Sequence, residues 1–258
     1  MKKFMRNRNF FYISLLVLLL TIIPYKAHAI DISVGATTWY SWWDWNHMDS
    51  LADLKVDPTF LYGPALSVKF NDDFNLTFIY LYGKFKVNVE GDDAGEDWKM
   101  SIKRRDSDLA LNYRLNDYFK IFAGIKYMTY LFSLPMSDGN FTLEQNGIGP
   151  GLGLSAAYPM LENLFLIGNI SCMYLWGDEK IVNKKQESKS DIKQYGINSS
   201  LSIAYYIEPA STVISLGGRY QYYKTAYYNI DKDDWELLNA YKDKFYGITL
   251  TATYSFSI

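Results

Sequence analysis

The last twelve residues of the chain, 247–258, read GITLTATYSFSI, and they decide the fold class. Two kinds of side chain alternate without a break: Ile, Leu, Ala, Tyr, Phe and Ile form one face, and Gly, Thr and Ser form the other. A period of two held over this length indicates a β-strand longer than the usual five or six residues. A tilted strand needs about 9–11 residues to cross a bilayer. The sequence therefore predicts a strand with one apolar face that is long enough to span a membrane.

The same alternation recurs along the rest of the chain. Further strands are predicted at 30–43, 60–70, 74–89, 102–115, 119–132, 147–158, 164–176, 192–207 and 212–223. The connections alternate between long polar segments and tight turns at Asn71, Asn116, Glu162 and Pro209. We therefore expect an all-β fold, a ten-stranded antiparallel up-and-down transmembrane β-barrel, with the long loops at one rim and the short turns at the other.

The first 29 residues have the layout of a secretory signal peptide. Four basic residues precede an apolar run over 10–23, and Ala27-His28-Ala29 supplies the small residues of a cleavage site. We expect a leader over 1–29 and a barrel domain over 30–258. The leader holds five of the 26 lysines and arginines and none of the 28 acids, so the remainder has a net charge of −7. That balance argues against a nucleic-acid partner.

These features resemble the outer-membrane β-barrel proteins of Gram-negative bacteria, which share the signal peptide, even strand number, short periplasmic turns and long external loops. The resemblance implies a place in the cell outer membrane, in contact with outer-membrane lipid and lipopolysaccharide. In that family the last strand, here Tyr246 to Ile258, is the signal read by the barrel-insertion machinery. The family usually ends on Phe, whereas this chain ends on Ile258 with Phe256 two residues earlier. The resemblance concerns architecture and names no individual function.

A soluble secreted barrel, with its apolar face turned inward, is the rival architecture. The Tyr, Leu, Ile and Phe side chains of ten strands are difficult to fit inside a small barrel. The opposite face also lacks the Lys and Glu that are common on a sheet face in contact with water. Tyr and Trp also cluster near strand ends, where the aromatic girdles of membrane barrels lie. We expect the following residues near the external interface: Trp39, Tyr40, Trp42, Trp43, Trp98 and Trp176.

The stretch 147–158, GIGPGLGLSAAY, places a glycine at every second position of its first half. In a membrane barrel the apolar face meets lipid, so the opposite face lines the lumen. Glycines there leave room for bulky side chains from the opposite wall or for water, and they let the strand bend. Pro150 lacks a ladder donor and predicts a bulge. Barrel closure and a ligand channel both remain open as reasons for the predicted lumen glycines, Gly147, Gly149, Gly151 and Gly153.

Charged residues are also expected in the lumen. If the strands on either side of the Asn116 turn pair symmetrically, Asp108 lies opposite Lys126 and both point inward. Arg219 points inward at the same height above the start of its own strand. Opposite charges facing across antiparallel strands attract, and a narrow lumen screens them less than water does. We expect Asp108, Lys126 and Arg219 to form a cluster that braces the barrel and constricts any pore, the alternative being separate hydration.

An enzyme is the alternative function. His47 is the one histidine beyond the leader, with Asp44, Asp49 and Ser50 nearby, and a His beside an Asp can serve as a general base. An outer-membrane enzyme of the protease or lipid-modifying type would use it. Ten strands is also the number in the omptin proteases, a resemblance of strand number only. No second element fixes the geometry of His47, so we expect no catalytic residue and a narrow channel, or a structural or binding protein at the cell surface.

Two charged loop segments have compositions that are typical of binding sites. The acidic segment 90–97, EGDDAGED, is similar to a divalent-cation site, but it lacks the spacing of an EF-hand loop. A lysine-rich segment holds Lys184, Lys185, Lys189 and Lys193, which either meet anionic lipopolysaccharide or are simply solvated. We expect no bound metal and no cofactor.

Overall fold

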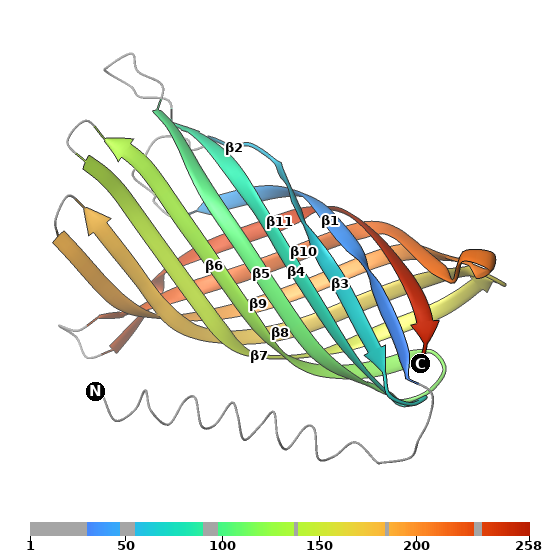
Figure 1. Cartoon of the computed structure of the whole chain (residues 1–258). Helices are drawn as coiled ribbons and strands as arrows, with labels where there is room; N and C mark the ends of the chain where they lie inside the picture. The colour runs from blue at the N-terminus through green and yellow to red at the C-terminus, as the bar shows by residue number, and fades with distance from the viewer. Residues whose placement is uncertain (1–29, 47–54, 90–97, 137–138, 184–185, 230–233) are drawn as a thin grey trace.

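The computed structural model describes residues 30–46, 55–89, 98–136, 139–183, 186–229 and 234–258. These residues form one antiparallel sheet that closes on itself into a barrel (Figure 1). No helix among the described residues is long and apolar enough to cross a membrane. The predicted leader, 1–29, lies outside this part of the chain, so the division into leader and barrel stays a prediction.

The wall of the barrel follows the order of the sequence. Its strands are β1 (Asp31–Asn46), β2 (Lys55–Val56), β3 (Thr59–Lys69), β4 (Phe74–Val89), β5 (Trp98–Arg114), β6 (Phe119–Met136), β7 (Gly139–Leu161), β8 (Leu164–Asn183), β9 (Gln186–Ile207), β10 (Thr212–Asn229) and β11 (Asp234–Ser257). The short β2 pairs with β4, as β3 does, so β2 and β3 together occupy one place in the wall. Pairing of β1 with β11 closes the ring. The predicted ten-stranded up-and-down barrel is confirmed.

Tight turns join the strands at one rim, where the predicted turn residues lie. The side-chain oxygen of Asn71 accepts hydrogen bonds from the backbone N–H groups of Asp73 and Phe74, at 2.9 and 2.8 Å. Asn116 accepts in the same way from the backbone N–H groups of Tyr118 and Phe119, where β6 begins. A 3-10 turn, η1 (Glu208–Ala210), joins β9 to β10. The end of the chain lies at this rim beside the start of β1 (Figure 1). In outer-membrane barrels such a rim faces the periplasm, and we call the opposite rim external.

Most strands run further toward the external rim than the sequence predicts. β7 has 23 residues and β11 has 24, about twice what a bilayer requires. The segments 139–146, 177–183 and 234–243, predicted as parts of long loops, are therefore strand, which corrects the prediction. The physical reason is that a wall beyond the membrane meets water on its outer face. Its polar side chains then no longer alternate with apolar ones, and the period of two disappears from the sequence.

The outer face carries a band of exposed apolar side chains, such as Leu152, Leu201 and Leu216. Toward the external rim the band ends in a belt of aromatic residues around the barrel. We call this belt the external girdle: Tyr40, Trp42, Tyr82, Tyr127, Trp176, Tyr195, Tyr222 and Tyr246. On several strands the next outer-face residue toward the external rim is charged, as in the case of Lys84, Lys224 and Lys244. Apolar side chains exposed between aromatic rings form the lipid-facing surface of a membrane barrel. The soluble alternative, which turns this face inward, is wrong.

The tryptophan prediction holds only in part. Tyr40 and Trp42 face outward in the girdle, and the Trp42 ring stacks on Tyr246 with the centroids 6.0 Å apart. Trp39 and Trp43 instead point into the lumen, where 0% and 6% of their surfaces are exposed. Successive strand residues point to opposite faces, so neighbours in the sequence are separated by the wall. The side chain of Trp98 lies outside the described part of the chain.

Candidate functional site in the barrel lumen

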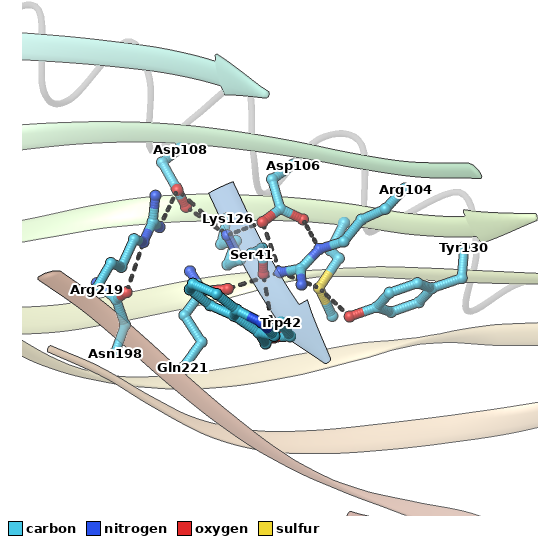
Figure 2. Close-up of polar contacts among 11 residues, drawn as sticks. Ser41, Trp42, Arg104, Asp106, Asp108, Lys126, Tyr130, Asn198, Arg219 and Gln221 are labelled. Atoms are coloured by element: carbon cyan, nitrogen blue, oxygen red, sulfur yellow. Dashed lines mark hydrogen bonds and ion pairs between the residues drawn. The ribbon is translucent and has the colours of Figure 1, made fainter. Parts of the chain in front are cut away.

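The structure brings Asp108, Lys126 and Arg219 together inside the barrel (Figure 2). Asp108 on β5 is paired with Lys126 on β6, in the predicted register. The Lys126 amine donates to both carboxylate oxygens of Asp108, at 3.0 and 3.2 Å. Arg219 on β10 lies 3.5 Å from the same carboxylate, and its Nε donates to Asn198 at 3.0 Å. Because β10 is separated from β6 by β7, β8 and β9, these contacts span the lumen.

Two further charged residues on β5, Arg104 and Asp106, extend this group along the lumen toward the external rim. The Arg104 Nε and Nη2 donate to the two carboxylate oxygens of Asp106, at 3.2 and 2.8 Å. Asp106 also lies 3.5 Å from the Lys126 amine, and Arg104 Nη2 donates to the Gln221 side chain at 2.6 Å. We call Arg104, Asp106, Asp108, Lys126 and Arg219 the lumen cluster. The sequence analysis did not identify Arg104 and Asp106. They lie at every second position from Asp108, so the alternation of β5 would have placed them on the same face.

Aromatic rings enclose the outer end of the lumen cluster. The Arg104 guanidinium carbon lies 3.7 Å from the Phe245 ring centroid and 5.5 Å from those of Trp39 and Tyr130. Such contacts stabilise a buried cation, most strongly where water is excluded. Further apolar side chains continue this packing, and together we call them the aromatic core: Trp39, Trp43, Leu61, Leu81, Phe85, Val87, Ile102, Met128, Tyr130, Phe132, Met173, Leu175, Tyr223 and Phe245. Cluster and core fill the outer part of the lumen.

Arg104 and Asp106 form a buried ion pair, with side chains 0% and 1% exposed. Charges taken out of water are stable together only where their geometry is close and further hydrogen bonds satisfy them. Asp106 also lies 3.5 Å from the Lys126 amine, and Arg104 donates to Gln221, so both members of the pair have a second polar partner.

The periplasmic half of the lumen is hollow. A cavity of about 390 Å³ lies directly beneath the lumen cluster, and Asp108, Lys126 and Arg219 form its roof. Hydroxyl and amide side chains such as Ser200 share its walls with apolar ones such as Met173. A second cavity, of about 600 Å³, lies at the periplasmic rim. The external half of the lumen is thus filled by side chains, whereas the periplasmic half contains cavities.

No protein-family model matches the chain, and no curated protein matches its sequence. Among solved structures, the outer membrane protease OmpT from Escherichia coli is similar, with a TM-score of 0.55 and 12% identity over 91% of this chain and 98% of that one. The protein folds as a bacterial outer-membrane β-barrel. A major outer membrane protein from Thermus thermophilus gives a TM-score of 0.44 and 14% identity over 89% and 100% of the two chains. OprG from Pseudomonas aeruginosa gives 0.35 and 16% over 91% and 99%. At these identities the likeness is one of fold alone.

The predicted lumen glycines line the interior of this outer-membrane barrel, and two of them, Gly149 and Gly153, accommodate the neighbouring strands rather than the opposite wall. A Cβ on Gly153 would lie 2.3 Å from the Phe122 ring of β6, which covers it. A Cβ on Gly149 would lie 1.9 Å from a backbone oxygen of β8. Ile148 and Gly151 pair with β8 in one register on either side of Pro150, so the predicted bulge there is wrong. The irregularity lies between Pro159 and Leu161 instead.

Several predicted loop features lie outside the described residues of the outer-membrane barrel, namely His47, Asp49, Ser50, Lys184, Lys185 and the acidic segment 90–97. Asp44, near His47 in sequence, accepts a hydrogen bond from Lys244 at 3.0 Å. Lys189 lies 3.5 Å from Asp178. The described part of the chain contains no group of three or more His, Cys, Asp and Glu side chains placed to hold a metal ion.

Proposed function

We propose that the protein is a non-catalytic outer-membrane barrel with a structural or binding role at the cell surface, and that its lumen is sealed rather than conducting. The observation that carries this proposal is the lumen cluster, in which Arg219 of β10 meets Asp108 of β5, and Arg104 of β5 meets Gln221 of β10, across the lumen at the external edge of the membrane band. The aromatic core packs directly outside it. Small barrels generally fill their interiors in this way.

The energetics favour a seal over a gated channel. An ion crossing the lumen would have to pass between β5 and β10, where Arg104 donates to Gln221 at 2.6 Å and Arg219 lies 3.5 Å from Asp108. Losing one hydrogen bond to a charged group costs about 1.5–3 kcal/mol. Each 1.4 kcal/mol is a factor of ten in population, so opening one such contact disfavours the open state by roughly 10–10² before any aromatic side chain moves.

The external wall supports a role at the surface. β8 and β9 continue past the girdle, and ion pairs across them join Lys180 to Glu187 at 2.9 Å and Lys189 to Asp178 at 3.5 Å. Paired strands of this length form a rigid platform above the membrane. A platform of this kind suits contact with other surface components, while the barrel beneath anchors it in the lipid.

Reconstitution into planar bilayers tests the sealed lumen. Heat-modifiable migration in gels would first establish that the reconstituted barrel is folded. We expect folded wild-type protein to give no discrete conductance steps at moderate voltage. Regular steps from the wild-type protein would contradict the proposal, because they require a continuous aqueous path.

Activity assays test the non-catalytic part separately. Wild-type protein and the His47→Ala variant would be incubated with a peptide library and with outer-membrane lipids. We expect equal, background levels of cleavage from both. Any cleavage or lipid modification that the wild type performs and His47→Ala loses would establish the enzyme alternative.

A further inference from the structure

Four cations gather on the outer face of β4 and β5, immediately external to the girdle. Lys84 and Lys86 follow the girdle residue Tyr82 on β4, and Lys103 and Arg105 occupy the same face of β5. Lys84 is paired directly with Lys103, and Tyr82 with Arg105. Three of the four are exposed and Lys103 is partly exposed. We call Lys84, Lys86, Lys103 and Arg105 the cation patch.

The cation patch is not neutralised by the described part of the chain. None of its four side chains has an ion pair or a side-chain hydrogen bond there, whereas the outward Lys244, Lys180 and Lys189 each have a carboxylate partner. Asp57, between β2 and β3, contacts the patch through its backbone N–H, which donates to the carbonyl of Lys86 at 2.9 Å. Like charges directly opposite each other destabilise a sheet. The arrangement therefore favours an external anion.

The position of the patch defines the chemistry of that anion. It lies at the height where the apolar band gives way to polar head groups. Beside it on β3 are two exposed rings, Phe60 and Tyr62, which present 57% and 58% of their surfaces, and Tyr62 is paired with Tyr82 of the girdle. A ligand that matches both surfaces has acyl chains below and several negative charges above. A single phosphodiester would leave most of the four charges unbalanced, whereas a head group with two or more phosphates would balance them.

We propose that the cation patch binds the phosphate groups of lipopolysaccharide, with the acyl chains lying on the band beneath. This inference is independent of the sealed lumen. In the lysine-rich segment Lys189 has an acidic partner, Asp178, at 3.5 Å, whereas Lys184 and Lys185 lie outside the described residues, so contact of that segment with lipopolysaccharide stays a separate prediction. The patch holds one glycolipid at a fixed place on the outer wall, over β4 and β5.

The test measures binding of purified lipopolysaccharide to the refolded full chain in detergent, comparing wild type with the Lys84→Gln/Lys103→Gln variant. Each cation near an anionic surface contributes about fivefold in affinity, so we expect the double variant to bind on the order of 25-fold more weakly. Lys180→Gln/Lys189→Gln is the matched control, since it also removes a directly paired pair of lysines, and we expect its affinity to stay within about twofold of wild type.

Two further probes make the proposal falsifiable. Without lipopolysaccharide, Lys84→Gln/Lys103→Gln should unfold at a temperature no lower than wild type, because the substitutions relieve repulsion; the stabilisation that the glycolipid gives should be lost. Equal affinity of the double variant and wild type would overturn the proposal. So would equally tight binding of dephosphorylated lipopolysaccharide, or of phosphatidylglycerol vesicles, which present single phosphates.

Discussion

Replacing Asp106 by Asn should destabilise the barrel more than the same change at Asp108, the other acid of the lumen cluster. Asp106 is 1% exposed and joins two cations, accepting from Arg104 at 2.8 and 3.2 Å and lying 3.5 Å from the Lys126 amine. The amide keeps the shape of the carboxyl group but removes its charge. Its NH₂ group can also face a donor where the carboxylate accepted.

The size of the effect follows from what remains after the substitution. Arg104 stays fully buried and loses its carboxylate, and removing one partner of a buried pair costs about 3–5 kcal/mol. Asp108→Asn provides the comparison. The Asp108 side chain is 30% exposed and Lys126 retains Asp106, so we expect a loss of only about 1 kcal/mol. The difference between the two variants reports burial, because the chemical change is identical.

Urea unfolding of the refolded proteins in detergent measures both losses. Tryptophan fluorescence is a suitable signal because the Trp39 ring lies 5.5 Å from the Arg104 guanidinium, and far-ultraviolet circular dichroism gives an independent second probe. If Asp106→Asn costs no more than Asp108→Asn, the cluster is not the buried, mutually dependent network described here.

Two further outcomes are expected. Gly153→Ala should cost about 1–3 kcal/mol by overpacking, measured by urea unfolding, whereas Gly218→Ala, whose Cβ would have its nearest contact at 3.9 Å, should be close to neutral. In variants that retain a single tryptophan, brominated lipid should quench Trp42 and leave Trp39 unaffected; the opposite result would invert the assigned faces.

The membrane-spanning wall could be predicted from the sequence because lipid imposes a strict alternation on it. Every second residue of 247–258 must be apolar to face lipid, and the pattern survives in each strand. The Asn116 turn fixed the register of β5 and β6, which placed Asp108 opposite Lys126. Contacts between adjacent strands joined by a short turn are local in the sequence, so they can be counted outward from the turn residue.

Contacts across the lumen could not be predicted in this way. Arg104 meets Gln221 and Phe245, which lie on β10 and β11, and that meeting depends on how the closed ring is sheared and tilted. Trp39 and Trp43 differ from these contacts, because their alternation with Tyr40 and Trp42 already indicates the lumen, whereas tryptophan near a strand end predicts the interface. Outside the membrane band both wall faces can carry polar residues, so the extensions of β7 and β11 left no periodic signal.

Sided labelling of lumen cysteines tests the sealed barrel most directly. In a Cys172→Ser background, which removes the native thiol, Ser215→Cys would place one thiol in the cavity beneath the lumen cluster, and Ser188→Cys would place one on the external wall as a control. A small membrane-impermeant maleimide would be added to either side of oriented vesicles. The sealed barrel predicts that Ser215→Cys reacts from the periplasmic side alone, while Ser188→Cys reacts from the external side. Reaction of Ser215→Cys from the external side at a comparable rate would show a continuous path past Arg104 and Asp106 and would contradict the account.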